Sequence, residues 1–348
     1  MKKVMSLILA MTIILCVSAC GSRGGTPSGA QSAANSDSNT AGTAEYNLRL
    51  GDQLAQSHPY NTAAVYMAEL IEERTNGRVH IDVFPSSQLG SERELLEGVQ
   101  MGTVDMCIAS GPMASFDSDF YIGDLPNLFT SKEHAYRVLD GEIGQNILDG
   151  LENVQMKGLS FWETGWLCMF NNERLIETPE DLKGLSMRTM ENNVYVNYFS
   201  ALDCNPVPMA YSEFVTSVSN GTINGTMSPI VTIYTDKTYE ICPYITRAYQ
   251  WYTPAALVMN LDVWNSFDDE LKQIVSECAQ EARDYERQQL AELEDGYIEE
   301  IKAAGGTVFD ADTELWASQT DAIDAAWSEI VPSKVSQELI DQIRELAD

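Results

Sequence analysis

The chain has 348 residues and carries 52 Asp and Glu against 21 Lys and Arg, a formal net charge of −31. This acidic balance argues against nucleic-acid binding and against polybasic contact with a membrane, because both depend on Lys and Arg. The three histidines are scattered along the chain, and no Cys or His pair has the spacing of a metal site, so the sequence predicts neither a metal nor a cofactor.

The first 20 residues predict a lipoprotein signal peptide. Lys2 and Lys3 precede an apolar run at 4–17, and Ser18-Ala19-Cys20 follows. Positive charge, an apolar run and small residues before a cleavage point are the parts of a secretory signal. The stretch 17–20 resembles the bacterial lipobox, which makes Cys20 the predicted lipidation site. An ordinary signal peptide that happens to have a Cys after its cleavage site is the alternative.

Residues 21–44 predict a flexible tether, because almost all of them are Gly, Ser, Ala, Thr or Asn and none is a large apolar residue. About 300 residues remain for the folded part, enough for two lobes. Five cysteines fall in this part, mostly among apolar neighbours, and we interpret them as buried small hydrophobic residues: Cys107, Cys168, Cys204, Cys242 and Cys278.

Helix and strand patterns alternate in the first part of the body. Apolar–polar alternation or a short apolar run predicts strands at 46–52, 79–85 and 104–110. A helix is expected at 61–78, where apolar residues recur on one face. Ser91 and Glu94 have the spacing of a capping box, which predicts that another helix begins there. This β-α-β-α-β order is typical of a parallel sheet covered by helices.

A second set of elements begins near Thr164. A helical turn is expected at 179–181, and the further strands and helices are expected at 185–190, 192–201, 211–219, 221–227 and 253–260. The pattern then stays helical from Asp268 to Ala304, about ten turns, which predicts a helix long enough to run along both lobes. The tail from Glu314 to Ala347 is expected to be one amphipathic helix.

These patterns predict an α/β protein of two lobes that share a long helix. Lobe I is expected to comprise residues 45–163 plus about 252–290, and lobe II residues 164–251 plus about 291–348. Two lobes joined by several crossings enclose a cleft, and ligands of α/β proteins bind in clefts at the carboxyl ends of strands.

One arginine is the best candidate for a ligand contact. In the strand 185–190, alternation places Arg188 on the face opposite Met187, at the carboxyl end and beside Met190. A guanidinium there can hold a carboxylate through two parallel N–H···O bonds. The alternative is an internal ion pair, because a chain with 52 acidic residues offers many partners.

Several stretches resemble the solute-binding proteins of tripartite ATP-independent periplasmic (TRAP) transporters, the C4-dicarboxylate-binding (DctP-like) type. The similar segments are TNGRVHIDVFPSSQLGSERELLEGVQMGTVDM (75–106), DLPNLFTSKEHAYRVLDGEIGQ (124–145), TPEDLKGLSMRTM (178–190) and NPVPMAYSEFVTSVSNGTING (205–225). The resemblance covers roughly residues 46–275. It implies the two-lobed fold of periplasmic binding proteins, and it assigns to Arg188 the family's grip on a ligand carboxylate.

The resemblance also implies a function. Such a receptor captures a small organic acid outside the cytoplasmic membrane and delivers it to a permease with one small and one large membrane subunit. Uptake driven by an ion gradient needs no ATP site, and no phosphate-binding loop of the Gly-x-x-x-x-Gly-Lys type is present.

Two positions depart from the family pattern. Leu167 stands where relatives usually carry a second arginine, and Met227-Ser228-Pro229 replaces a stretch with Glu and Asn. The pocket should therefore be less polar than that of a typical sugar-acid or dicarboxylate receptor. Trp166, Trp251, Tyr252 and Met227 could line it, although lobe core is the plainer role for the three aromatic residues.

The remaining candidate contacts are His58, Ser110 and Tyr211. His58 follows the first strand, where relatives place polar contacts, although a surface turn is equally plausible. Ser110 follows the strand at 104–110 and could donate one hydrogen bond. Tyr211 falls in the segment that resembles the hinge side of the family's cleft.

Two other functions stay open at this point. An enzyme would need a catalytic motif, and the chain has no Gly-x-Ser-x-Gly elbow and no paired metal ligands, so no catalytic residue is predicted. A sensor lipoprotein that signals to a membrane kinase would use the same closing clamp, and sequence alone does not separate it from a transport receptor.

Overall fold

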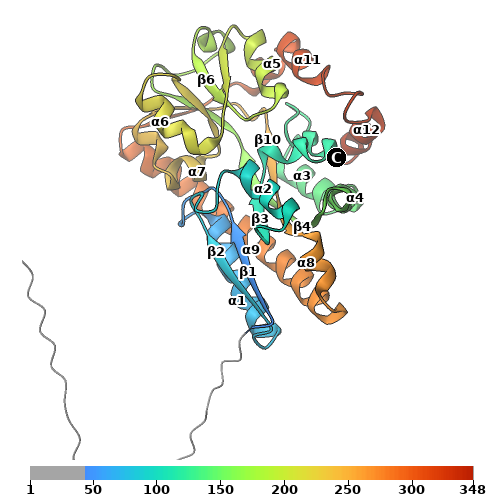
Figure 1. The fold of residues 1–348 in the computed structure, drawn as a ribbon. Coiled ribbons are helices and arrows are strands. Elements are labelled where there is room, and N and C mark those ends of the chain that lie inside the picture. Colours follow the sequence, from blue (N-terminus) through green and yellow to red (C-terminus); the bar gives the residue numbers. More distant parts are fainter. Residues whose placement is uncertain (1–43, 348) are drawn as a thin grey trace, which may run out of the picture. The chain divides into compact units, whose positions relative to one another are not determined.

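The computed structural model describes residues 44–347. The predicted signal peptide, Cys20 and nearly all of the predicted tether lie outside these described residues. Within them the strands form two separate sheets, A and B, which lie in lobe I and lobe II (Figure 1). The predicted α/β class is therefore confirmed.

Sheet A has the strand order β2-β1-β3-β10-β4. Its strands are β1 (Tyr46–Gly51), β2 (Val79–Phe84), β3 (Met106–Ala109), β4 (Met156–Trp166) and β10 (Tyr252–Asn260). β1 pairs in parallel with β2 and β3, as the alternating pattern predicts, whereas β10 runs antiparallel to β3 and β4. The carboxyl ends of β1 and β3 consequently lie at the same edge of the sheet.

Sheet B has the strand order β11-β9-β5-β8-β6-β7. Its strands are β5 (Cys168–Asn171), β6 (Ser186–Thr189), β7 (Asn205–Pro208), β8 (Gly225–Ser228), β9 (Tyr244–Arg247) and β11 (Thr307–Asp310). β8 passes so close to β5 that a Cβ atom on Gly225 would lie 2.0 Å from the carbonyl oxygen of Phe170. Glycine at this position thus allows the close approach of the two strands.

Helices cover both sheets. Those of the first 150 residues are α1 (Pro59–Arg74), α2 (Glu92–Met101), α3 (Lys132–Leu139) and α4 (Glu142–Gly150). The later ones are α5 (Asn193–Ala201), α6 (Phe214–Ser219), α7 (Ile230–Thr235), α8 (Leu261–Ser266), α9 (Asp269–Ala303), α10 (Thr313–Ala317), α11 (Thr320–Trp327) and α12 (Gln337–Glu345). The predicted capping box is present at α2, because Ser91 and Glu94 bond each other's backbone N–H groups.

In the described part of the chain, three segments connect the two sheets. β4 of sheet A continues through Leu167 into β5 of sheet B, and β9 returns into β10 through residues 248–251. The third is α9, which the sequence predicted as a long shared helix. Its Leu271 and Val275 pack in the apolar cluster with α1 and sheet A, whereas Ile298 and Ile301 pack in the cluster of sheet B.

The tail differs from its prediction. Three helices, α10, α11 and α12, replace the single helix expected at 314–347. Pro332 interrupts the segment because it has no backbone N–H to donate to a helix. α11 packs against α5 of lobe II, and the carbonyl oxygen of Ile343 in α12 lies 2.8 Å from Nε2 of His134 in α3. The end of the chain therefore contacts lobe I (Figure 1), and the predicted limits of the lobes stay a prediction.

Candidate functional site

A cavity lies between the two sheets, where the strand ends of both lobes meet. It contains about 430 Å³ of space between atoms, part of it open to solvent. Lobe I contributes Gln53, Leu54, Tyr60, Glu92, Ser110 and, from β4 of sheet A, Thr164. Lobe II contributes Leu167, Arg188, Met190, Tyr211, Met227, Ser228, Pro229 and Thr232. The cavity thus combines one guanidinium, one carboxyl group, several hydroxyls and an apolar wall.

Arg188 stands in the wall of this cavity without a carboxylate partner. Its Nε donates a hydrogen bond of 2.9 Å to the carbonyl oxygen of Met209, and its Cζ lies 5.6 Å from the centre of the Tyr211 ring. Among residues 44–347, no carboxylate oxygen lies within 4.0 Å of its nitrogens. The side chain is 6 % exposed, and burial lowers the pKa of the guanidinium. The internal ion pair considered above is therefore absent from the described residues.

A buried carboxyl group shares the cavity with Arg188. Glu92 begins α2, and its Oε1 accepts hydrogen bonds from the backbone N–H of Ser110 at 3.0 Å and from its Oγ at 3.1 Å. Burial raises the pKa of Glu92, while the Ser110 bonds and the charge of Arg188 act in the opposite direction. Glu92 and Ser110 come from neighbouring elements of lobe I, so together they form one polar end of the cavity.

Two hydrogen bonds connect the lobes beside the cavity. Oδ1 of Asp236 accepts from the backbone N–H of Ala55 at 3.2 Å, and its Oδ2 accepts from the hydroxyl of Tyr211 at 3.0 Å. Nε2 of His58 lies 3.1 Å from Oγ1 of Thr232 in α7. The loop that follows β1 is thereby held against α7 and the residue that follows it.

Seven of the ten predicted contact residues line the cavity, and three do not. The seven are Ser110, Leu167, Arg188, Met190, Tyr211, Met227 and Ser228. His58 caps α1 instead: its Nδ1 accepts from the backbone N–H of Tyr60, and burial lowers its pKa to about 3. Nδ1 is thus unprotonated, and Nε2 donates to Thr232.

The two tryptophans also lie outside this cavity, Trp251 in the core and Trp166 half-buried. Trp251 is buried in the core, in contact with the rings of Tyr195, Tyr198 and Phe199. Trp166 packs edge-on against Tyr249 and Tyr252 outside this cavity. Large rings bury much apolar area, which favours such interior positions.

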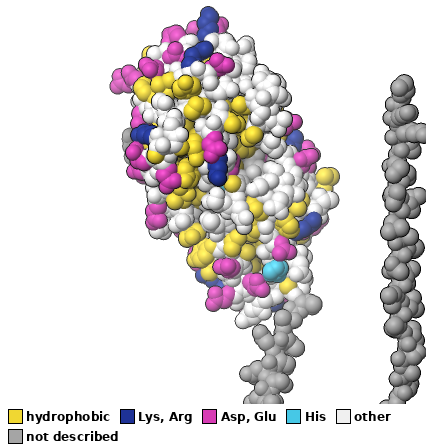
Figure 2. Space-filling view, turned by 90° about the vertical axis from the view of Figure 1, so that its left-hand side faces the viewer, with side chains coloured by type: hydrophobic (Ala, Val, Ile, Leu, Met, Phe, Trp, Pro, Cys, Tyr) yellow, Lys and Arg dark blue, Asp and Glu magenta, His cyan; other side chains and the backbone are white. Residues whose placement is uncertain are grey.

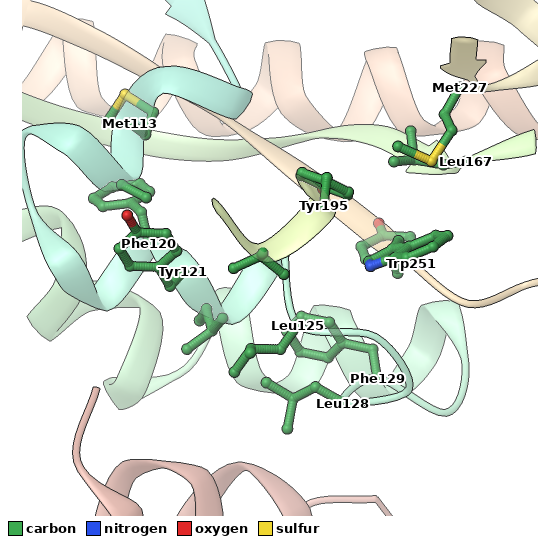
Figure 3. Close-up of a cluster of buried hydrophobic side chains, with 14 of the residues drawn as sticks. Met113, Phe120, Tyr121, Leu125, Leu128, Phe129, Leu167, Tyr195, Met227 and Trp251 are labelled. Atoms are coloured by element: carbon green, nitrogen blue, oxygen red, sulfur yellow. The ribbon is translucent and has the colours of Figure 1, made fainter. Parts of the chain in front are cut away.

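The positions that depart from the family pattern lie together. Leu167 and Met227 are each 3 % exposed and both line the cavity. Figure 3 shows the two side chains next to each other, with Trp251 nearby. They form an apolar wall. That the pocket is less polar than those of typical relatives stays a prediction.

Sequence reasoning missed several lining residues: Gln53, Leu54, Tyr60, Glu92, Thr164, Pro229 and Thr232. The position of Glu92 could have been inferred, because the capping box places it at the start of a helix that follows a strand of the parallel sheet. The others depend on which elements meet across the two lobes.

Among the described residues, no group of three or more His, Cys, Asp or Glu side chains could hold a metal ion.

None of the helices in residues 44–347 is long and apolar enough to span a bilayer. On the face that Figure 2 shows, Asp and Glu side chains are scattered along the outline, and hydrophobic side chains gather toward the middle.

A two-sheet α/β fold that encloses a cavity between lobes, with an unpaired guanidinium facing it, defines a solute-binding receptor. The chain belongs to the bacterial extracellular solute-binding proteins, family 7 (DctP), whose model matches residues 50–334. Family members are binding proteins and not enzymes, so the absence of a predicted catalytic residue agrees with the family.

Relatives support this assignment along most of the chain. The 2,3-diketo-L-gulonate-binding periplasmic protein YiaO of Escherichia coli (strain K12) is 30% identical over 311 residues, which cover 89% of this chain and 92% of YiaO. The C4-dicarboxylate-binding periplasmic protein DctP of Rhodobacter capsulatus is 31% identical over 300 residues, covering 85% of this chain and 87% of DctP.

A solved structure gives the same result for the fold. The TRAP periplasmic solute-binding protein from Polaromonas sp. JS666, bound to D-erythronate, superposes with a TM-score of 0.82 at 32% identity. The match covers 86% of this chain and 98% of that protein. The chain is therefore an extracytoplasmic solute-binding receptor of the TRAP type, and the sensor alternative is not favoured.

Proposed function

We propose that the inter-lobe cavity binds a small organic acid and that Arg188 holds its carboxylate. The observation that carries the proposal is a buried guanidinium with no carboxylate within 4.0 Å among the described residues. A buried charge without a counter-ion is costly, and an incoming carboxylate removes that cost. The Nε of Arg188 donates to the backbone of Met209, which leaves the two terminal nitrogens to bind two carboxylate oxygens.

Other cavity residues complete the proposed site. Ser110 and Glu92 offer a polar group opposite Arg188, with Glu92 accepting from a ligand hydroxyl. Met190 and Tyr211 flank Arg188, while Leu167, Met227 and Ser228 form the wall contributed by lobe II. His58, Trp166 and Trp251 are not part of this proposed site, because they do not line the cavity.

Binding is proposed to be coupled to closure of the lobes. The bonds from Ala55 to Asp236 and from His58 to Thr232 join opposite lobes, so they form only when the cleft is closed. A ligand that contacts both lobes stabilises this closed state by its greater affinity for it. The closed, loaded receptor then presents its solute to the small and large membrane subunits of a TRAP permease.

Attachment of the receptor to the membrane by a lipid is proposed from the sequence. A lipid on Cys20 would retain the receptor at the outer face of the cytoplasmic membrane, with residues 21–44 as the tether. Cys20→Ser is expected to release the mature protein into the soluble fraction. Retention of the variant in the membrane fraction would contradict lipidation at this position.

The carboxylate-binding function is tested with a library of organic acids screened by differential scanning fluorimetry. A ligand raises the free energy of unfolding by about RT ln(1 + [L]/Kd), so acids that saturate the site are detected as upward shifts in melting temperature. For each such acid, calorimetry should show that Arg188→Ala weakens binding at least roughly tenfold.

Arg78→Ala is the matched control, because Arg78 is ion-paired to Glu45 and Asp268 outside the cavity. It should leave the affinity unchanged. Equal affinities for the wild type and Arg188→Ala would refute the proposed site.

A further inference from the structure

The charges of the cavity limit what its ligand can be. Among the described lining residues Arg188 is the only cation and Glu92 the only carboxyl group. A first ligand carboxylate can pair with Arg188. A second one would find no second cation in this lining and would lose its hydration without a counter-ion.

Most polar groups of the cavity are already engaged by the protein. The hydroxyls of Tyr60 and Thr164 lie 2.6 Å apart, and Thr232 is bonded to His58. Ser110 donates to Glu92, and Tyr211 donates to Asp236. A ligand with many hydroxyl groups would therefore have to break internal hydrogen bonds in order to form its own.

The cavity also has apolar lining residues. They are Leu54, Leu167, Met190, Met227 and Pro229, and none of their side chains donates or accepts a strong hydrogen bond. A ligand hydroxyl placed there would lose its bonds to water without replacement. A methyl group in the same place would instead gain contact with Leu167 and Met227.

From this arrangement, and resting on the proposed carboxylate site, we infer that the solute is a compact monocarboxylic acid with an apolar carbon body. Its carboxylate binds Arg188, one hydroxyl or keto group beside the carboxylate faces Glu92, and the apolar end packs against Leu167 and Met227. Dicarboxylates and polyhydroxylated sugar acids are excluded as preferred solutes.

Three acids with the same 2-hydroxy-acid head group separate these classes. They are 2-hydroxyisovalerate, whose end is apolar, malate, whose end is a second carboxylate, and erythronate, whose end carries two hydroxyl groups. Titration calorimetry of the wild type should show that 2-hydroxyisovalerate binds at least about tenfold more tightly than the other two.

Variants of the apolar wall test its contribution to the preference among the three acids. Leu167→Arg supplies a second cation and should move the preference toward malate, whereas Leu167→Met conserves volume and apolarity and should keep the wild-type order. Met227→Gln places an amide in the same wall. Like Leu167→Arg, it should reduce the preference for 2-hydroxyisovalerate over malate. It carries the test if the Arg variant does not fold.

The outcomes distinguish the inference from the proposed function on which it rests. Tighter wild-type binding of malate or erythronate that is lost in Arg188→Ala overturns the inference and leaves the carboxylate site intact. Equal affinity of all three acids also overturns it, as does an unchanged order in both Leu167→Arg and Met227→Gln. If the wild type binds none of the three acids and no acid of the library, both the inference and the proposed function are overturned.

Discussion

The carboxylate of Asp236 in lobe II accepts a hydrogen bond from the backbone N–H of Ala55 in lobe I and a second one from the hydroxyl of Tyr211. The Tyr211 ring in turn lies against the guanidinium of Arg188. A chain of direct contacts therefore runs from the proposed carboxylate-binding residue to a bond that joins the two lobes.

Removal of this inter-lobe bond should weaken ligand binding without touching the ligand. Asp236→Ala deletes both acceptors, and Asp236 does not line the cavity, so the expected effect is a smaller population of the closed form. The apparent Kd rises in proportion as the competent fraction falls, and we expect an increase of roughly fivefold to 100-fold. Calorimetry measures the affinity, and small-angle X-ray scattering measures the opening. The exposed Asp203, which pairs with Lys183 on the surface, gives the control Asp203→Asn, because asparagine tolerates the positive φ of this position. A closed, ligand-tight Asp236→Ala variant would disprove the coupling.

Replacement of Arg188 by lysine tests geometry separately from charge. Lysine keeps the positive charge but offers a point donor in place of the planar fork, and it cannot reproduce the Nε bond to Met209. We expect Arg188→Lys to bind carboxylates at least about tenfold more weakly than the wild type, with Arg188→Ala weaker still. Calorimetric affinities of the wild type, Arg188→Lys and Arg188→Ala for one acid measure this difference. Lysine performing as well as arginine would show that two parallel bonds are unnecessary.

Asp124 should make the free energy of unfolding depend on pH. It accepts hydrogen bonds from Asn192 and Tyr195, and burial raises its pKa to about 8. Because the folded protein binds this proton more tightly than the unfolded chain, stability from this group is fully present below pH 3.8 and is lost as the pH rises toward about 8.

Asp124→Asn removes this titration while it keeps a neutral side chain of the same shape. The free energy of unfolding of the wild type should therefore fall relative to that of the variant as pH rises through this range, by at most about 1.4 kcal/mol per pH unit. Asp52 and Asp236, whose pKa values are also raised, are present in both proteins, so their contributions cancel. Denaturant titrations at a series of pH values measure the difference, and parallel curves would rule out the protonated form.

The cap of α2 should stabilise both the fold and the site. Oγ of Ser91 accepts from the backbone N–H of Glu94, whose carboxylate accepts from the N–H of Ser91 at 2.8 Å. Ser91→Ala should lower the free energy of unfolding by about 1 kcal/mol, and Ser91→Asp should restore most of it because aspartate is a good N-cap. Chemical denaturation gives both values. An Ala variant as stable as the Asp variant would mean that the cap is not needed.

Local patterns were sufficient to predict much of the fold. The capping box of Ser91 and Glu94, the alternation in β6 and the unbroken helical pattern of α9 all depend on neighbours in sequence, and all appear in the structure. The same alternation directed Arg188 away from Met187 and toward the cavity. The strands β9 and β11 were not predicted, because each has only four residues and neither follows a capping box like the one at 178–181 that precedes β6.

The roles of individual side chains depended on partners distant in sequence. His58 is the N-cap of α1 and also donates to Thr232, a residue 174 positions later. No local sequence pattern predicts such a bond. Glu92 is buried because Ser110 donates two hydrogen bonds to it from another element. Trp251 became core because three aromatic rings surround it. Only the assembled lobes determine such environments.

The helix α9 belongs to the interior of both lobes, with Leu271 and Val275 at one end and Ile298 and Ile301 at the other. Neither half of the molecule can therefore be excised as an independently folding unit, because each would lose part of its own packing. Melting of one half strips apolar cover from the other, so denaturation should be a single cooperative event in spite of the two separate sheets.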